Sequence, residues 1–254
     1  MNTRKFISKL FLTMSVIMVM SGVAFCATGS LVTYQVTGQS YEGYYISPSE
    51  QAPLVLLIHD WDGLTDYEIK RANMLAESGY AVFAADLFGT GVRPTEVPDK
   101  RQHTGELYKN REQMRALMTG ALDAAKERGA KIENAVAVGY CFGGAAVLEL
   151  ARSGADLKGF ATFHGGLKTP EGQNYTKTRG EILIMHGSAD SSITMDQFAD
   201  LDRELESAGV AHEMITYGGA QHAFTVFGGN RYQEDADKKS WKRFQDFLSD
   251  KLNP

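Results

Sequence analysis

The stretch Ala135-Val136-Ala137-Val138-Gly139-Tyr140-Cys141-Phe142-Gly143-Gly144 decides the fold of this chain. Its four apolar residues predict a strand buried on both faces. The glycines around Cys141 predict a sharp turn into a helix, because strand and helix backbones pass close together there. Such a turn strains the backbone of Cys141 and lifts its sulfur over the sheet edge. It also leaves the N–H of Phe142 at a helix N-terminus, where it can face an oxyanion. The stretch predicts a nucleophilic cysteine; the alternative is a buried structural cysteine beside a glycine-rich turn.

Strand and helix patterns alternate along the rest of the chain. The alternation predicts one α/β domain over residues 27–254, with a mostly parallel twisted sheet and helices on both faces. Residues 31–36 and 41–46 suit an antiparallel edge pair that turns at Gly38-Gln39. The other expected strands are 54–58, 80–85, 135–138, 159–163, 182–185 and 213–217. The expected helices are 65–76, 106–128, 145–152, 195–207 and 236–252. Active sites of such sheets lie at the carboxyl ends of the strands.

Two of these strand ends carry further candidate catalytic residues. His186-Gly187-Ser188-Ala189-Asp190 follows strand 182–185, and Gln221-His222-Ala223-Phe224 follows strand 213–217. Nucleophile, acid and histidine in the order Cys141, Asp190, His222 is the chain order of the α/β-hydrolase fold. In this interpretation Cys141 attacks a carbonyl carbon, His222 takes the thiol proton, and Asp190 fixes the tautomer of His222. The alternatives are a helix-capping aspartate and an ordinary loop histidine.

The turn after strand 54–58 is expected to complete the oxyanion hole. Its sequence is Asp60-Trp61-Asp62-Gly63, and the N–H of Trp61 is the candidate partner of the Phe142 N–H. The Trp61 ring either walls the acyl pocket or packs as core. His164 stands at another strand end and is a weak candidate for substrate contact. No metal and no cofactor are expected, because no set of side chains has metal-ligand spacing and no glycine-rich turn has a nucleotide fingerprint.

The first 26 residues have the pattern of a secretory signal peptide. Arg4, Lys5 and Lys9 precede an apolar stretch, and Ala24-Phe25-Cys26 offers small residues at a cleavage site. The alternatives are a retained membrane anchor and a lipoprotein with lipidated Cys26, against which Phe25 argues. We therefore expect an exported protein, periplasmic or secreted, with no stable membrane contact after cleavage.

Charge and cysteine content narrow the class of protein further. The formal net charge is −5 with no basic run, which argues against nucleic acid as a partner. Cleavage after Cys26 would leave Cys141 as the single cysteine, so an internal disulfide would be impossible. We expect a monomer that acts on a small-molecule ester or lactone.

These motifs together resemble the dienelactone hydrolase family over about residues 54–248. The likeness rests on residues 139–144, 186–190 and 222–224, and on Ala236-Asp237 with Ser240-Trp241. It implies a Cys-Asp-His triad that hydrolyses a lactone or ester through an acyl-enzyme without a cofactor. It also implies that a carboxylate at Asp60, glutamate in well-studied members, modulates the resting thiol. Arg71 matches a family arginine and is expected to pair with Asp60.

The chain departs from the family at two arginines that bind the substrate carboxylate. Thr90 and Val226 stand where those arginines would be, and Arg93 and Arg231 are the nearest replacements. The resemblance therefore predicts a preference for neutral esters or lactones. Two other functions remain open: a non-catalytic ligand-binding protein that kept the fold, and a thiol redox protein that uses Cys141. The second lacks a resolving cysteine.

Overall fold

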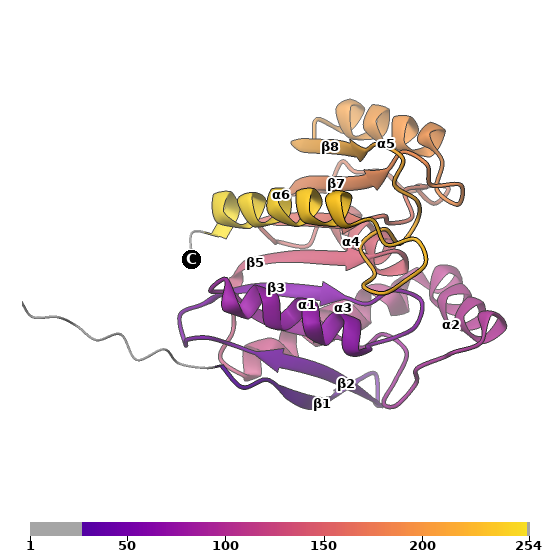
Figure 1. Cartoon of the computed structure of the whole chain (residues 1–254). Helices are drawn as coiled ribbons and strands as arrows, with labels where there is room; N and C mark the ends of the chain where they lie inside the picture. The colour runs from indigo at the N-terminus through magenta and orange to yellow at the C-terminus, as the bar shows by residue number, and fades with distance from the viewer. Residues whose placement is uncertain (1–26, 253–254) are drawn as a thin grey trace, which may run out of the picture.

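A computed structural model describes residues 27–252, in which one eight-stranded sheet forms the centre (Figure 1). The signal peptide predicted over residues 1–26 lies outside the described residues. The strands stand in the order β1-β2-β4-β3-β5-β6-β7-β8. Their bounds are Ser30–Val36 (β1), Gln39–Ile46 (β2), Pro53–Ile58 (β3), Ala81–Ala85 (β4), Lys131–Tyr140 (β5), Gly159–Phe163 (β6), Glu181–Gly187 (β7) and His212–Tyr217 (β8).

Strand directions follow the sequence pattern. All pairs from β4 through β8 are parallel, whereas β1 and β2 are antiparallel to their neighbours. The edge hairpin is confirmed: Val36 pairs with Gln39 across a turn in which Thr37 and Gly38 have φ of 49° and 81°. The mostly parallel α/β sheet is confirmed as well, and it brings the strand ends that carry polar residues to one edge.

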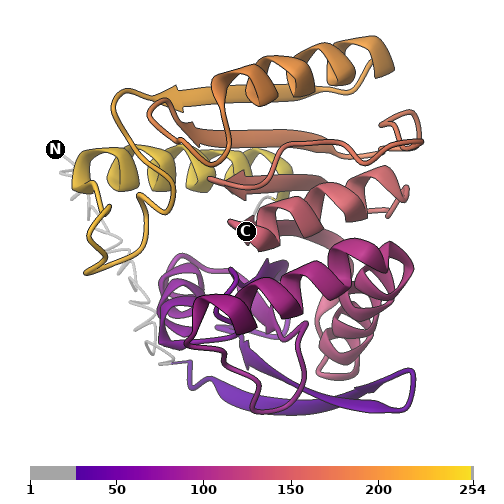
Figure 2. The same cartoon turned by 90° about the vertical axis from the view of Figure 1, so that its right-hand side faces the viewer.

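Residues 27–252 form six helices, and all but α2 cover the two faces of the sheet (Figure 2). Alternate residues of β3 show the division. Leu54 and Leu56 pack in a core cluster that includes residues of α3 and α4, while Val55 and Leu57 pack in a second cluster with α1 and α6. The helices are Asp66–Glu77 (α1), Val97–Lys109 (α2), Arg111–Glu127 (α3), Phe142–Arg152 (α4), Met195–Ala208 (α5) and Glu234–Leu252 (α6). Both faces of the central strands are therefore buried, as their continuous apolar runs predict.

The start of α1 follows its sequence signal. The Thr65 side chain accepts from the backbone of α1, and Glu68 Oε2 accepts from the Thr65 N–H at 2.9 Å. This capping box satisfies N–H groups that have no partner inside the helix. It also fixes where the turn after β3 ends.

The expected single helix over 106–128 is wrong. The structure has two helices there, α2 and α3, which meet at Asn110 with φ −116° and ψ 76°. The Asn110 side chain accepts from the Gln113 N–H at 3.0 Å and so caps α3. The apolar spacing continues across the junction, so periodicity gave no sign of the break. Asparagine as an N-cap was the available signal.

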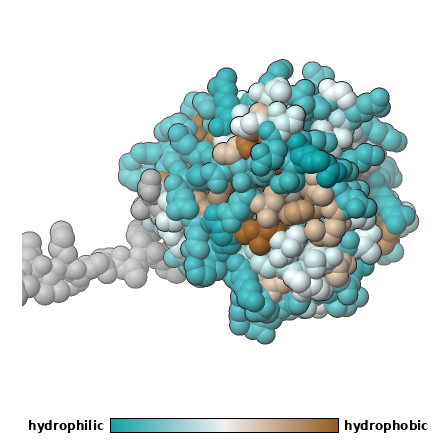
Figure 3. Space-filling view, turned by 90° about the horizontal axis from the view of Figure 1, so that it is seen from above, coloured by the Kyte–Doolittle hydropathy of each residue, from teal (hydrophilic) through white to brown (hydrophobic). Residues whose placement is uncertain are grey.

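Helix α2 lies beyond the carboxyl ends of the parallel strands (Figure 1). The face in Figure 3 is mostly hydrophilic, and its largest group of apolar side chains lies near the centre of the view. Within residues 27–252, no helix combines the length and apolarity needed to cross a bilayer, and no three His, Cys, Asp or Glu side chains are grouped as metal ligands.

Candidate active site

Cys141 stands at the tip of a sharp turn between β5 and α4. Its φ is 52°, the strained conformation expected for this turn. A Cβ on Gly139 would lie 2.2 Å from the Gly143 backbone, and one on Gly143 would lie 2.4 Å from the carbonyl oxygens of Ile58 and His59. Both glycines are therefore required by close backbone approach. Cys141 is a free thiol and is only half-buried.

The three predicted triad residues come together at the sheet edge. His222 Nε2 lies 3.1 Å from the Cys141 sulfur, and His222 Nδ1 lies 2.7 Å from Asp190 Oδ2. The carboxylate thus fixes the tautomer of the imidazole and directs Nε2 at the sulfur. This is the geometry in which a base can take a proton from a nucleophile.

Asp190 is held by its own loop. Its second oxygen, Oδ1, accepts from the N–H groups of Ser192 and Ile193 at 2.8 and 2.9 Å. Burial by itself would raise the pKa of Asp190, but the hydrogen bonds from His222 and from these N–H groups outweigh it and lower the pKa. Asp190 therefore stays ionised next to His222.

The surroundings of His222 raise the pKa of its imidazole. Burial would lower its pKa, yet the hydrogen bond to Asp190, together with the contact to the Cys141 sulfur, raises the pKa to about 10. The imidazole is therefore protonated at neutral pH and lies beside the Cys141 sulfur.

His164 packs against the ring of His222, and Thr225 contacts His164. The two imidazole rings lie edge to face with centroids 5.3 Å apart, and His164 Nε2 lies 2.8 Å from Thr225 Oγ1. The Thr225 hydroxyl also contacts the Tyr67 hydroxyl at 2.7 Å. His164 is fully buried, and the substrate contact expected of it stays a prediction. Burial, then the charge of His222, lowers its pKa well below the usual value, and the ring is neutral.

The expected ion pair between Arg71 and Asp60 is not formed. Arg71 instead pairs with Asp237 of α6 and donates to the Thr225 carbonyl at 2.8 Å. Its Nε donates to the Tyr67 hydroxyl at 3.3 Å. The guanidinium is almost completely buried, so its charge requires an anionic partner that is buried beside it. Arg71 thereby joins α1 and α6 to the segment that follows His222.

The two expected oxyanion donors, Phe142 and Trp61, follow the neighbouring parallel strands β5 and β3. Phe142 is the first residue of α4, where an N–H has no acceptor within the helix. Trp61 follows β3 in a turn held by a contact between Lys100 Nζ and Asp62 Oδ1 at 2.6 Å. The Lys100 ammonium also lies 5.2 Å from the Trp61 ring centroid. Helix α2 thus fixes the turn that carries the second donor, and Trp61 packs partly against the core.

Asp60 lies near the triad as expected, within a group of carboxylates. Burial, then the charge of Asp62, raises its pKa to about 6, and the positive charge of His222 is among the effects that lower it. Asp60 Oδ1 accepts from the Asp62 N–H at 2.8 Å. Glu68 is fully buried, and burial followed by the charge of Asp60 raises its pKa to about 8. At neutral pH Glu68 is mostly protonated.

His59 contributes to the site without having been identified in the sequence. Its Nε2 accepts from the Leu87 N–H at 3.0 Å, which leaves Nδ1 as the donor to the Asp60 carbonyl at 2.6 Å. Burial lowers its pKa to about 4, so this tautomer is neutral. His59 thereby connects the end of β3 with the segment after β4, next to the turn that carries Trp61. A polar residue directly after a buried strand was the available signal.

A hollow of about 450 Å³ lies between the α2–α3 junction, the start of α4 and the segment after β6. The N–H groups of Ala145 and Gly166, both in its lining, donate to the Cys141 carbonyl at 3.4 and 3.2 Å. Ile193, also in its lining, donates to Asp190. The hollow therefore borders the backbone segments that hold Cys141 and Asp190.

Tyr108 and Arg111 line this hollow and were not singled out in the sequence. They flank Asn110, the residue at which the expected long helix breaks. The Tyr108 ring packs edge to face on Phe142 with centroids 5.4 Å apart. Burial, and next the charge of Cys141, raise the pKa of Tyr108. Its hydroxyl therefore lies in the field of the nucleophilic sulfur.

The two arginines named as possible substrate contacts lie elsewhere. Arg93 donates through Nη1 to the Val92 carbonyl at 2.7 Å, pairs with Asp86 at 3.7 Å, and also donates to the Leu64 carbonyl. These contacts use the Arg93 guanidinium to hold the segment after β4. Arg231 is exposed in the loop before α6. Neither lines the hollow at the start of α4.

Fold and site together define an α/β-hydrolase. The family model of the dienelactone hydrolase family matches residues 41–252. A "Protein usf" of Aquifex pyrophilus is 24% identical over 201 residues, with 77% of this chain and 87% of the relative covered. A Synechocystis protein named "Putative carboxymethylenebutenolidase" is 24% identical over 240 residues, with 88% and 97% covered. The crystal structure of a dienelactone hydrolase-like promiscuous phosphotriesterase from metagenomic libraries is similar, with TM-score 0.82 and 28% identity over 89% of this chain and 99% of that one.

The chain belongs to the dienelactone hydrolase family, as the motifs around Cys141, Asp190 and His222 predict. Membership makes it a hydrolase of carboxylic esters or lactones that acts on small molecules. The fold expectation, an α/β-hydrolase with a mostly parallel sheet, is confirmed.

Proposed function

We propose that the protein is an exported, cysteine-dependent hydrolase that cleaves a carboxylic ester or lactone through an acyl-enzyme on Cys141. One observation carries the proposal: the contacts from sulfur to His222 at 3.1 Å and from His222 to Asp190 at 2.7 Å. The strained backbone of Cys141 and the helix N-terminus at Phe142 support the same chemistry.

The reaction takes place in two balanced halves. His222 holds the thiol proton while the sulfur attacks the carbonyl carbon, and the resulting oxyanion accepts from the Phe142 and Trp61 N–H groups. The C–O bond then breaks, the leaving alkoxide takes the proton from His222, and a thioester remains. A water gives its proton to His222 and attacks the thioester, which releases the acid and restores the thiol.

Both alternative functions differ from this one in what they require of the site. A binding protein needs no ordered nucleophile, base and acid, and an assembled triad supports catalysis instead. A thiol redox protein needs a second sulfur, and Cys141 is the cysteine that residues 27–252 contain. Export is supported by the sequence pattern of residues 1–26, and the mass of the mature N-terminus after expression in a bacterium would test it.

The acyl-enzyme can be tested directly by mass spectrometry. A panel of para-nitrophenyl esters and lactones is mixed with the enzyme, quenched in acid and digested. We expect the acyl mass on the peptide that contains Cys141, and neither adduct nor turnover with Cys141→Ala. Turnover that survives in Cys141→Ala, or an adduct on another residue, would overturn the mechanism.

A further inference from the structure

His164 contacts His222 from a backbone that is itself fixed against the nucleophile. Its φ is 42°, a region in which histidine is one of the few residues other than glycine to be enriched. The residues on either side of it hold Cys141: the Cys141 N–H donates to the Phe163 carbonyl at 3.1 Å, and the Gly166 N–H donates to the Cys141 carbonyl at 3.2 Å. The His164 ring therefore reaches His222, with centroids 5.3 Å apart, from a segment that cannot shift without moving Cys141.

A chain of hydrogen bonds reaches the His164 ring from α1. Arg71 Nε donates to the Tyr67 hydroxyl at 3.3 Å, and that hydroxyl lies 2.7 Å from Thr225 Oγ1. Thr225 Oγ1 lies 2.8 Å from His164 Nε2. If Tyr67 donates to Thr225 and Thr225 donates to His164, each hydroxyl hydrogen has an acceptor within the chain; in the reverse direction, the Tyr67 hydrogen has none. Nε2 of His164 is therefore the acceptor, and Nδ1 carries the proton.

The contact with His164 matters most when the sulfur no longer holds His222. In the free enzyme, the His222 ring is held at both nitrogens, by Asp190 Oδ2 at 2.7 Å and by the Cys141 sulfur at 3.1 Å. Once Cys141 carries an acyl group, its sulfur belongs to a thioester and has no proton to share with Nε2. Of the contacts described above, those with Asp190 and His164 remain while Nε2 takes a proton from water. Burial, then the charge of His222, lowers the pKa of His164 well below its usual value, so its ring does not compete for that proton.

We propose that His164, oriented through Thr225 and Tyr67, is a positioning residue that keeps His222 in place while water hydrolyses the acyl-enzyme. The inference rests on the proposed acyl-enzyme and names the half of the reaction that this chain of hydrogen bonds serves. In that half, a water proton goes to His222 and the water oxygen attacks the thioester carbon. The C–S bond then breaks, and the sulfur takes the proton from His222. His164 neither gives nor takes a proton in these steps.

The two halves of the reaction can be measured separately with para-nitrophenyl acetate. The first release of nitrophenolate reports acylation, and the decay of the acetyl mass on Cys141, in samples quenched after the ester is used up, reports hydrolysis. Thr225→Val replaces the hydroxyl by a methyl group and interrupts the chain. We expect hydrolysis of the acyl-enzyme to slow by about tenfold, the effect of about one hydrogen bond, and acylation to change less than about threefold. Once hydrolysis limits turnover, kcat and KM fall together and kcat/KM stays nearly unchanged.

Further variants connect this effect to His164. Thr225→Ser keeps the hydroxyl and should hydrolyse the acyl-enzyme within about threefold of the wild-type rate. His164→Asn introduces a residue that tolerates positive φ but removes the ring, and it should show the same selective loss. The double variant His164→Asn with Thr225→Val should be hardly slower than His164→Asn alone, because the hydroxyl acts through the ring.

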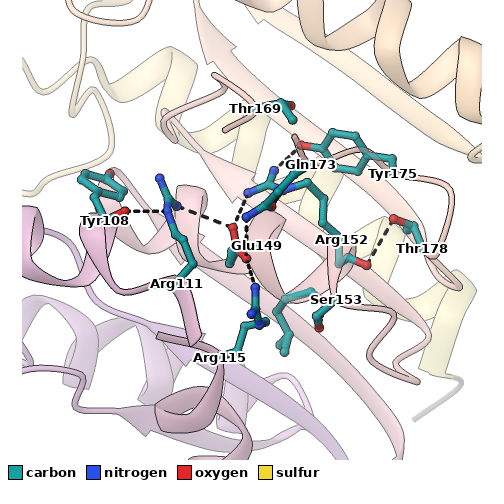
Figure 4. A network of polar contacts seen from close by, with 12 residues as sticks. Tyr108, Arg111, Arg115, Glu149, Arg152, Ser153, Thr169, Gln173, Tyr175 and Thr178 are labelled. Carbon is teal, nitrogen blue, oxygen red and sulfur yellow. Dashed lines mark hydrogen bonds and ion pairs between the residues drawn. The ribbon is translucent and has the colours of Figure 1, made fainter. Parts of the chain in front are cut away.

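Two matched controls lie outside this chain of hydrogen bonds. Thr162→Val makes the same change in β6, at a fully buried hydroxyl that has no hydrogen-bond partner among residues 27–252. Tyr175→Phe removes a buried hydroxyl that, like that of Tyr67, accepts from an arginine: Arg152 Nη1 donates to it at 2.7 Å in the network around Glu149 (Figure 4). Tyr175 packs in the core cluster on the opposite face of the sheet from Tyr67. Both controls should leave the two rates unchanged, and thermal melts check that every variant is folded.

Failure of this inference can be told apart from failure of the proposed function. Equal slowing of both halves in Thr225→Val, or a selective loss of hydrolysis in Thr162→Val or Tyr175→Phe, would overturn the role of His164. So would a His164→Asn enzyme that hydrolyses its acyl-enzyme at the wild-type rate. If no acetyl mass appears on Cys141 in wild type or in any variant, the proposed acyl-enzyme itself fails, and this inference fails with it.

Discussion

The backbone of Cys141 is held at φ 52°, where residues other than glycine are seldom found. The turn keeps this conformation because both flanking backbones are fixed by close contacts at Gly139 and Gly143. Such strain costs of order 1–3 kcal/mol and persists only when the surrounding structure imposes it. At the scale of single residues, the strained backbone of Cys141 lowers the stability of the fold but places the sulfur opposite His222.

Asp60 gives a first prediction at this scale. An ionised carboxylate near the sulfur disfavours a sulfur anion, so Asp60→Asn should speed alkylation of Cys141 by iodoacetamide several-fold at pH 7–8. The pKa of Asp60 is about 6, so the two proteins should react at similar rates below that pH. The measurement is the alkylation rate from pH 5 to 9. Identical profiles would mean that Asp60 does not influence the sulfur.

The triad gives a second prediction. Cys141→Ala and His222→Ala should each lower kcat at least about a thousandfold, and the double variant should be hardly worse, because the two side chains act in one step. Asp190→Asn should be milder than the loss of Cys141, since Asp190 orients and stabilises His222. Steady-state kinetics on one para-nitrophenyl ester decides this. Losses that multiply in the double variant would contradict a shared step.

Between elements, the catalytic loop is held by contacts that lie far apart in the sequence. Arg71 of α1 pairs with Asp237 of α6 and donates to the Thr225 carbonyl, three residues after His222. Lys100 of α2 holds the turn that carries Trp61 through Asp62. Helices from both halves of the chain thus fix the two loops that carry His222 and Trp61.

The buried pair of Arg71 and Asp237 gives the prediction at the scale of elements. Arg71→Met leaves an unpaired buried carboxylate and should lower the free energy of unfolding by about 3–5 kcal/mol. Arg71→Met with Asp237→Asn should recover part of that loss, because no buried charge remains. Urea unfolding curves measure both. Additive losses in the double variant would show that the two residues do not interact.

The whole molecule carries a pH dependence through Glu68. Its pKa rises from the ordinary value of 4.5 to about 8 in the folded protein, so the folded state binds a proton that the unfolded state has released. Between these two values stability falls as the pH rises, by up to ~1.4 kcal/mol per pH unit. The contribution of Glu68 to stability is therefore greatest on the acidic side of this window.

Glu68→Gln should remove this dependence. Glutamine resembles the protonated acid and keeps an acceptor for the Thr65 N–H, so the variant should match wild type near pH 5 and exceed it near pH 8. Glu77→Gln, at the exposed end of the same helix, is the matched control and should follow wild type. Chemical denaturation at several pH values measures the difference. A constant difference between Glu68→Gln and wild type would refute the raised pKa.

The sequence by itself determined the strand-turn-helix at Cys141, the parallel sheet and the triad order. Each of these depends on a local pattern: an apolar run, flanking glycines or a polar residue at a strand end. Parallel strands bring such ends to one edge, so local patterns were enough to assemble Cys141, Asp190 and His222.

Only the tertiary structure decided which side chains meet across the fold. The partner of Arg71 stands 166 residues further along the chain, and a buried cation takes the anion that packing brings to it rather than the nearest in sequence. The break at Asn110 likewise lets the Tyr108 ring pack on Phe142, which follows the nucleophile, although helical periodicity continues through it. Local order follows from neighbours along the chain, whereas the chemistry that surrounds the sulfur follows from packing between distant elements.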